Sequence, residues 1–291
     1  MEIEEYARIA AVEDAHWWYR NTRALVADLL ADRLRTPRIE PDAALRILDA
    51  GCGPGGNGAW LAEHGEVVGV DLSPDALAFV SARRPGTRPV RGSVTALPLA
   101  SASVDVAIAV TVLYAVDNDV AAVHELARVL RPGGAIVLVE PAFDSLRRGH
   151  DDVVHGKRRY RRGRLRALVE AAGLRTERAT YAYSFLAPPA AALGALDRVR
   201  RPSSRETGAP TAHAAPAESD VDRRALDRVF APLAAQERRW LARHDVAVGT
   251  SLFLLATKPL PDAPRPAGCV RKPGMSRFGD ATSEEERESG G

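Results

Sequence analysis

The chain has 291 residues, of which 46% are hydrophobic and 27% are charged. These proportions are typical of soluble globular proteins and exclude a chain that is disordered throughout. The formal net charge is only +2, so the molecule as a whole is not expected to be drawn to nucleic acid or to an anionic membrane. Two cysteines exclude a disulfide framework, and the acidic N-terminus lacks the apolar core of a signal peptide, which together predict a cytoplasmic protein.

The apolar pattern changes in character along the chain. Residues 3–35 carry apolar side chains at helical spacing and are predicted to be helical. From residue 45 onwards short apolar runs alternate with amphipathic segments, which predicts βαβ units and a parallel sheet covered on both faces. The expected strands include 45–48, 67–70, 104–113, 135–139, 174–183 and 246–257, and the expected helices 59–64, 74–84, 119–130 and 161–172.

An insertion of residues 184–245 is expected between the last two strands. Its middle, 201–217, is rich in Pro, Ser, Ala and Gly, which predicts a mobile loop, and 221–244 reads as a helix interrupted near Pro232. The uncharged stretch 179–196 is as long as a short membrane span, but two central prolines argue against one. The expected organisation is a helical cap (1–40), a catalytic-type α/β domain (41–258) and a disordered tail (259–291).

The strongest local signal is the run Asp49-Ala50-Gly51-Cys52-Gly53-Pro54-Gly55-Gly56, which follows a predicted strand and precedes a predicted helix. Glycines permit a tight turn and let a ligand lie directly against the backbone. About twenty residues later the second strand ends at Asp71, where a carboxylate can accept both hydroxyls of a ribose. The glycine run and Asp71 together therefore predict a ligand with an adenosine-type ribose. A plain tight turn would leave the position of Asp71 unexplained.

Two ligand classes fit this pattern. The spacing Gly51-x-Gly53-x-x-Gly56 satisfies the dinucleotide fingerprint, which would indicate an NAD(P)-dependent oxidoreductase. However, about 45 mostly helical residues precede the first strand, whereas dinucleotide domains usually begin with it. Asp49 would repel a pyrophosphate but would attract the ammonium end of S-adenosylmethionine. These features favour S-adenosylmethionine, and no metal site is expected.

Five segments in this order resemble the motifs of the class I S-adenosylmethionine-dependent methyltransferases, particularly those that act on small molecules. The matching segments are 48–55, 68–73, 90–98, 103–106 and 125–134, and the resemblance extends over roughly 15–182 and the strand near 250. It implies a Rossmann-like, doubly wound α/β fold with a mostly parallel seven-stranded sheet, an N-terminal helical cap and a helical insertion before the last strand. It also implies that the cofactor contacts are Asp49, Gly51, Cys52, Gly53, Asp71, Leu72, Ser93, Val94, Val110, Tyr19 and Arg23.

The sequence departs from the family pattern at two positions. Ser93 stands where the family often has an aspartate that holds the adenine amino group, and a serine accepts that hydrogen bond less strongly. Tyr114-Ala115 stands where many relatives carry a Glu-His pair, so a histidine base from that position is missing. The turn Arg131-Pro132-Gly133-Gly134 is expected to stop a helix with two glycines of positive φ.

An aromatic cluster, His16-Trp17-Trp18-Tyr19, stands near the N-terminus, with Arg23 one turn of helix further on. The resemblance implies that this helix folds over the cofactor, and aromatic faces can hold a sulfonium by cation–π attraction. The alternative is that the tryptophans only anchor the helix to the sheet.

A basic stretch, 147–166, follows the fifth predicted strand, where an open α/β sheet binds its ligands. It favours recognition of an anionic substrate, with His155 or His150 as a general base and Tyr114 as a further candidate. A solvated helix face and nucleic-acid binding are the alternatives, and nucleic acid is not expected because the net charge is balanced.

The sequence therefore predicts methyl transfer from S-adenosylmethionine to an oxygen or nitrogen nucleophile of a small molecule or peptide, in specialised metabolism. The alternatives are an NAD(P)-dependent oxidoreductase and a non-catalytic protein that retains a cofactor pocket.

Overall fold

The computed structural model describes residues 3–35, 44–147, 156–192 and 224–261. The chain up to Leu260 forms one compact unit, and Pro261–Gly291 forms a second, of which only Pro261 is described. The predicted mobile loop at 201–217 and almost all of the predicted tail lie outside the described residues.

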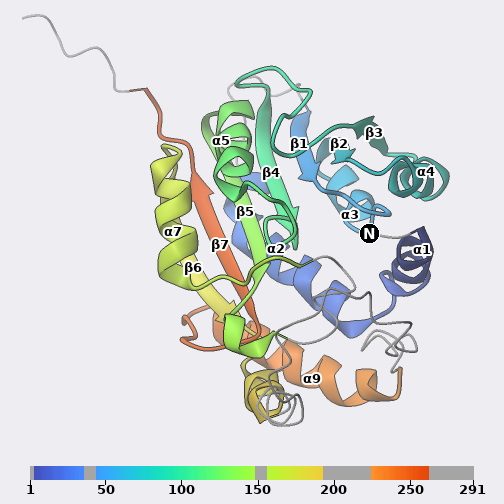
Figure 1. Ribbon diagram of the computed structural model, residues 1–291, viewed down its shortest axis with the longest axis vertical. Helices are drawn as coiled ribbons and strands as arrows, with labels where there is room; N and C mark the ends of the chain where they lie inside the picture. Colours follow the sequence, from blue (N-terminus) through green and yellow to red (C-terminus); the bar gives the residue numbers. More distant parts are fainter. Residues whose placement is uncertain (1–2, 36–43, 148–155, 193–223, 262–291) are drawn as a thin grey trace, which may run out of the picture. The chain divides into compact units, whose positions relative to one another are not determined.

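A seven-stranded sheet in the order β3-β2-β1-β4-β5-β7-β6 forms the centre of the first unit (Figure 1). All neighbouring pairs run parallel except those of β7, which is antiparallel to both β5 and β6. The chain order reverses between β1 and β4, and the carboxyl ends of these strands border the crevice where open α/β sheets bind ligands. The strands are β1 (Leu45–Ala50), β2 (Gly65–Asp71), β3 (Thr87–Arg91), β4 (Val104–Val110), β5 (Leu130–Pro141), β6 (Arg175–Ala182) and β7 (Ser251–Thr257).

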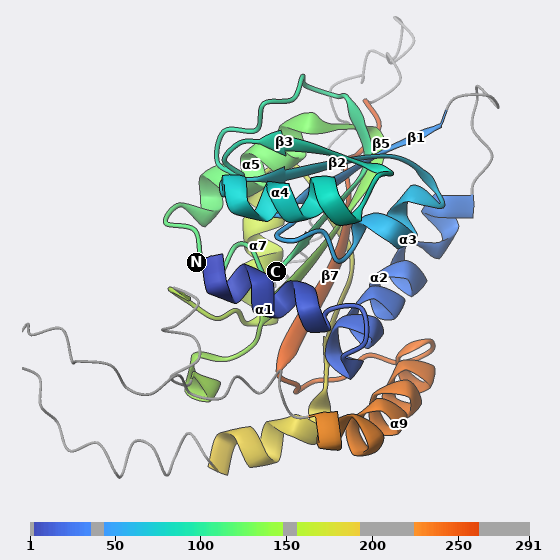
Figure 2. The ribbon, with the colours of Figure 1, turned by 90° about the vertical axis from the view of Figure 1, so that its right-hand side faces the viewer.

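Helices cover both faces of this sheet, so its strands are apolar nearly throughout. One buried cluster joins the sheet to α5 and α7, and another joins its other face to α2, α3 and α9. Helix α1 packs beside α4, and α2 packs beside α9 (Figure 2). The helices are α1 (Ile3–Val12), α2 (Trp17–Arg35), α3 (Gly58–Ala62), α4 (Pro74–Arg83), α5 (Asp119–Val129), α7 (Arg162–Ala171) and α9 (Arg224–Leu241), with short 3₁₀ turns η1 (Asp144–Leu146) and η2 (Ser184–Leu186). The predicted doubly wound fold is confirmed.

Local chemistry accounts for where two of these helices begin. The Ser73 hydroxyl accepts the Ala76 N–H at 3.3 Å, and a proline at the next position has the φ angle that a first helical turn needs. The Asn118 side chain likewise accepts the Ala121 N–H at 2.9 Å at the start of α5. Ser73 lies two residues after the end of β2, and Asn118 lies eight residues after the end of β4. Each cap sets the point at which its helix begins to turn back over the sheet.

The expected glycine turn at 131–134 is partly wrong. Only Gly133 has a positive φ, of 79°, and β5 already begins at Leu130. The Gly133 N–H donates to the Lys258 carbonyl at 2.8 Å, and the Lys258 N–H donates to the Gly134 carbonyl at 2.9 Å. Pairing with the chain that follows β7 therefore keeps this segment extended.

The expected interruption near Pro232 is also wrong, because α9 continues through it from Arg224 to Leu241. A proline inside a helix removes one backbone hydrogen bond and commonly breaks or kinks the helix. Here Phe230 and Ala234 on either side of it pack into the cluster shared with α2, and Arg238 pairs with Asp28 at 2.6 Å. Tertiary packing offsets the lost bond.

Within the described ranges, no helix combines the length and the apolar character needed to cross a bilayer.

Candidate functional site

The glycine loop after β1 adopts a backbone that few other residues could follow. Gly51, Gly53 and Gly55 have φ angles of 68°, 53° and 92°. The N–H groups of Gly51 and Cys52 both donate to the Val70 carbonyl, at 2.7 and 3.0 Å, which ties the loop to the end of β2. The loop therefore forms an open backbone cradle at the switch point of the sheet.

Gly51→Ala is expected to destabilise the protein and to weaken cofactor binding. A Cβ at this position would lie 2.5 Å from a Val112 methyl group, and the positive φ adds strain. Together these should cost roughly 1–3 kcal/mol of unfolding free energy, which urea denaturation would measure. Gly163→Ala is the matched control, because its Cβ would meet nothing within 4 Å. Equal stability of the two variants would contradict the tight contact.

Asp71 joins the glycine loop to the start of α4. Its Oδ2 accepts the Gly53 N–H and its Oδ1 accepts the Ser73 N–H, each at 2.9 Å. The side chain is buried at the tip of β2, and the ring of Tyr6 from α1 lies close enough to feel its charge. Asp71 is therefore held at the place where sequence analysis expects the ribose hydroxyls.

Asp71→Ala is expected to weaken binding of S-adenosylmethionine by about 1–3 kcal/mol through loss of charge-assisted ribose contacts. Isothermal titration calorimetry would measure the change. Ser73→Ala is the control, because it removes the α4 cap hydroxyl and costs stability but leaves the carboxylate in place. An unchanged dissociation constant in Asp71→Ala would contradict the ribose assignment.

Asp49 is a buried carboxylate with an unpaired oxygen. Its side chain is 1% exposed. Among the residues that the structure describes, its Oδ1 receives only a long 3.4 Å bond from the Asn57 amide and its Oδ2 has no hydrogen-bond partner. Burial raises the pKa of Asp49 to about 7, and the negative charges of Asp71 and Glu13 add to the shift. An uncompensated buried carboxylate is costly unless a cation joins it. The site therefore fits a cofactor that carries a positive group.

The other predicted cofactor contacts lie around the same strand ends and differ in how far they are buried. Cys52 and Val94 are buried, Leu72 is exposed, and Val110 is the last residue of β4. The Ser93 hydroxyl accepts the Thr95 N–H at 3.2 Å and shares a 2.7 Å bond with the Thr95 hydroxyl. The serine therefore organises its own turn as well as being available to an adenine.

The cap is fastened to the glycine loop by a charged network that sequence analysis missed. Buried Glu13, just after α1, pairs with Arg83 of α4 at 2.6 Å. Arg23 of α2 donates to the Glu13 carbonyl at 2.8 Å and to the Gly56 carbonyl at 3.4 Å. Arg23, which is predicted to contact the cofactor, thus lies beside the glycine loop, whereas no sequence pattern pointed to Glu13.

The aromatic cluster divides into two roles. Trp17 packs edge-on against Tyr183 at 5.4 Å and against Phe230 at 5.4 Å, so its ring anchors the cap to the insertion. This matches the alternative reading of that tryptophan. Tyr19 lies within electrostatic range of Tyr114 and Glu13, and burial raises its pKa. Of Trp17 and Tyr19, it is therefore Tyr19 that lies near Tyr114, which sequence analysis names as a candidate base.

Glu140 holds the loop that follows β4, and sequence analysis missed it as well. It is fully buried near the end of β5, and its carboxylate accepts three consecutive backbone N–H groups, from Val112 at 3.2 Å, Leu113 at 2.8 Å and Tyr114 at 3.0 Å. Burial raises the pKa of Glu140 to about 8 against the opposing effect of these bonds. The loop begins with a strained Thr111, whose φ is 53°. The sequence offered one signal for this role, because Glu140 is a charged residue that directly follows the apolar run of the predicted strand 135–139.

The described part of the basic stretch, 156–166, is occupied by internal contacts. Tyr160 donates to Asp119 at 2.8 Å and to the Leu113 carbonyl at 3.2 Å, and Arg164 pairs with Asp119 at 3.0 Å. The Tyr114 carbonyl accepts the N–H of Lys157 at 2.8 Å. Further partners are Asp117 for Lys157, Asp119 for Arg158, the Phe143 ring for Arg161, the Tyr181 ring for Arg162 and Glu170 for Arg166. These contacts give the segment a structural role in holding the backbone of Tyr114. They weaken the prediction that this segment recognises an anionic substrate. His150 and His155 lie outside the described residues.

Comparison with known proteins shows which proteins this chain resembles in sequence. The profile of the methyltransferase-domain family matches residues 48–138. A malonyl-[acyl-carrier protein] O-methyltransferase of Enterobacter lignolyticus is 39% identical over 121 residues, or 41% of this chain and 46% of the relative. A Mycolicibacterium smegmatis protein named as an S-adenosylmethionine-dependent methyltransferase is 30% identical over 58% of this chain and 63% of its own length. Over these segments the chain is similar to the methyltransferase-domain family and to proteins named as methyltransferases.

The solved structures support the same fold. A methyltransferase solved in complex with the Haloferax volcanii methyltransferase activator aligns with a TM-score of 0.55 and 18% identity, over 89% of this chain and 96% of that one. The Mycolicibacterium relative is named for S-adenosylmethionine, and the residues of the glycine loop, Asp49 and Asp71 fit that ligand. The matches span less than two thirds of the length of the curated relatives named above.

Proposed function

We propose that this chain transfers a methyl group from S-adenosylmethionine to an oxygen or nitrogen nucleophile of a small molecule or peptide. The observation that carries the proposal is the buried, unpaired Oδ2 of Asp49 beside the glycine loop. It requires a positive partner, which the ammonium end of S-adenosylmethionine would provide. Specialised metabolism and a cytoplasmic location remain part of the proposal.

The residues of the chain would act mainly by binding and alignment. Asp71 would hold the ribose, Asp49 the ammonium group, and the glycine loop would let the cofactor lie against the backbone. The bound cofactor supplies an activated methyl group on its sulfonium. Glu140 holds the backbone of Tyr114, so the wall on the acceptor side keeps one geometry, and such alignment contributes roughly 7–11 kcal/mol to methyl transfers of this kind.

The class of acceptor is a finer part of the proposal. The Enterobacter relative is named as a malonyl-[acyl-carrier protein] O-methyltransferase, which supports including carboxylic acids, and acyl thioesters that carry a free carboxylate, among the candidates. Arg158, Arg164 and Arg166 are paired with carboxylates and are poor candidates for recognising an anionic acceptor, whereas Arg161 and Arg162 contact aromatic rings and keep their charge. Tyr114, His150 and His155 stay the candidate bases for an acceptor that must lose a proton.

Calorimetry followed by turnover tests the proposal. S-Adenosylmethionine and S-adenosylhomocysteine should both bind, and NADH should release no heat. Mass spectrometry should then show a product 14 Da heavier among a panel of carboxylic acids, thioesters, phenols and amines, a difference of about one methylene unit. Binding of NADH in place of S-adenosylmethionine would overturn the assignment. Binding without turnover of any panel member would favour the non-catalytic alternative.

A further inference from the structure

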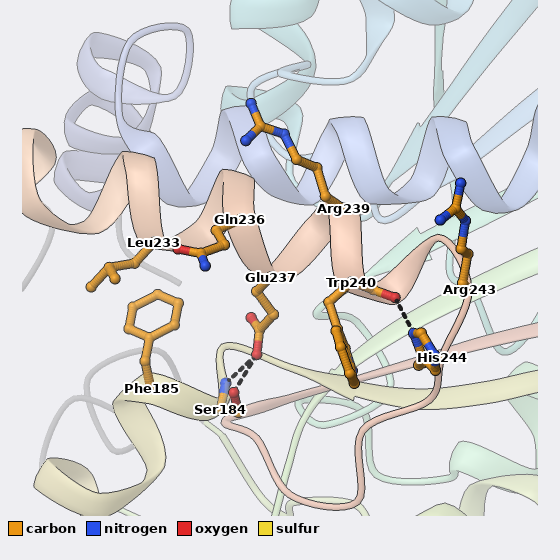
Figure 3. Close-up of a pocket in the computed structure, with 9 residues that line it drawn as sticks. All are labelled: Ser184, Phe185, Leu233, Gln236, Glu237, Arg239, Trp240, Arg243 and His244. Carbon is orange, nitrogen blue, oxygen red and sulfur yellow. Dashed lines mark hydrogen bonds between the residues drawn. The ribbon is translucent and has the colours of Figure 1, made fainter.

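A groove of about 610 Å³ lies between η2 and the C-terminal half of α9, away from the glycine loop (Figure 3). Most of its lining surface is apolar, and Phe185, Leu233 and Trp240 are its apolar residues. The full set of lining residues is Ser184, Phe185, Leu233, Gln236, Glu237, Arg239, Trp240, Arg243 and His244. No residue of the candidate functional site belongs to this set.

The outer face of α9 is apolar in its own right. Val229, Leu233 and Trp240 are 53%, 41% and 57% exposed. At 100° per residue these positions lie within about 60° of one another around the helix axis. The adjacent face, with Phe230, is already packed against the cluster shared with α2. The apolar arc of the helix thus extends beyond its packed face, and an exposed aromatic stripe of this kind marks an interaction surface.

The charge of the groove is positive. Glu237 is its only acidic lining residue, and it is used internally, because its carboxylate accepts the N–H groups of Tyr183 at 2.6 Å and of Ser184 at 2.8 Å. Figure 3 shows this side chain turned toward Ser184. Arg239 of α9 and Arg243, which lies two residues beyond the end of α9 at Leu241, have no carboxylate partner among the residues that the structure describes. The rim of the groove therefore carries two guanidinium groups that no described carboxylate neutralises.

We propose that this groove docks an acidic amphipathic helix of a partner protein. A concave apolar surface beside a helix accepts the apolar side of another helix, and the flanking arginines would pair with its carboxylates. Tryptophan and arginine are the residue types that most often dominate such interfaces. Trp240, whose ring stacks on His244 at 4.1 Å, is thus the anchor of the surface. This proposal does not depend on the methyltransferase activity.

The test uses the full chain and two synthetic helical peptides of about 18 residues, long enough to follow α9. Both carry leucines at positions i, i+3, i+4 and i+7, and their polar positions are glutamate in one and lysine in the other. Fluorescence anisotropy should show at least about tenfold tighter binding of the glutamate peptide, with an affinity that falls as salt rises. Trp240→Ala and the double variant Arg239→Glu/Arg243→Glu should each weaken it about tenfold or more.

A double variant of matched charge controls for net charge. Arg46→Glu/Arg88→Glu changes two exposed arginines on β1 and β3 by the same amount and should leave peptide binding unchanged. Calorimetric binding of S-adenosylmethionine and the melting temperature of every variant should match the parent, which separates loss of docking from misfolding.

Three outcomes would overturn the proposal: equal binding of both peptides, binding only to phosphatidylglycerol vesicles, or a dimer in ultracentrifugation that Trp240→Ala abolishes. The second would assign the surface to a membrane and the third to another copy of this chain.

Discussion

Asp49→Asn is expected to lose most affinity for S-adenosylmethionine and yet to make the ligand-free protein more stable. The asparagine keeps the shape of the side chain and removes a buried carboxylate whose Oδ2 has no partner. Loss of the partner of a buried cation should weaken binding by about 2–5 kcal/mol, or roughly 30-fold or more in Kd. Removal of the charge should stabilise the ligand-free fold at pH 8 by an amount of the order of 3 kcal/mol.

Calorimetry and urea denaturation would measure the two effects on the same samples. Asp75→Asn is the control, because Asp75 is an exposed aspartate in the first turn of α4, near the same end of the sheet. It should change both quantities only slightly. An Asp49→Asn protein that binds as tightly as the parent would refute the role given to this carboxylate.

The raised pKa of Asp49 also predicts how the parent protein responds to pH. Because the pKa is about 7 in the fold and near 4 in the unfolded chain, the contribution of this group to stability is complete below about pH 4 and is lost as pH rises through about 7. Affinity for S-adenosylmethionine should rise over the same interval, until the ligand's own ammonium group begins to lose its proton near pH 8. Both trends should vanish in Asp49→Asn, which titrations between pH 5 and pH 7.5 would show.

Glu140→Leu is expected to be the most destabilising single substitution in the site. It leaves three buried backbone N–H groups, those of Val112, Leu113 and Tyr114, without an acceptor. At about 1–3 kcal/mol for each stranded group, the expected loss is at least roughly 3 kcal/mol of unfolding free energy. Because Val112 lies directly against Gly51, displacement of this loop should also weaken cofactor binding.

Glu140→Gln and Glu125→Leu complete this experiment. Glutamine keeps one acceptor oxygen, so it should recover most of the stability lost in Glu140→Leu. Glu125 accepts a single backbone N–H, from Leu97 at 2.7 Å, and its side chain is 22% exposed, so water can replace it. Urea denaturation should rank the losses as Glu140→Leu, then Glu125→Leu, then Glu140→Gln. Parent-like stability of Glu140→Leu would mean that the loop does not depend on this carboxylate.

The cofactor half of the site could be predicted because its signals are local. The glycines that follow β1 need positive φ angles, and Asp71 ends the next strand, so two short segments specify the crevice. The supporting half could not be predicted in the same way. Glu13 meets Arg83, and Glu140 meets Val112, across 70 and 28 positions of sequence, and no spacing rule connects such residues.

The basic stretch, 147–166, shows the same difference between what a local pattern predicts and what distant partners decide. Its charges pointed to an anionic ligand, because a sequence shows how many arginines stand together but not which carboxylates face them. The fold places Asp117 and Asp119 opposite Lys157, Arg158 and Arg164, and so neutralises them.

The sequence by itself determined the alternation of strands and helices and the position of the glycine loop, because hydrophobic period and glycine conformation act within a few residues. The tertiary structure alone decided which charges are neutralised and that α9 runs through Pro232. It also decided that Asp49 keeps an unpaired oxygen while Glu140 does not. These outcomes depend on burial and on partners from distant segments, and both exist only after the sheet has assembled.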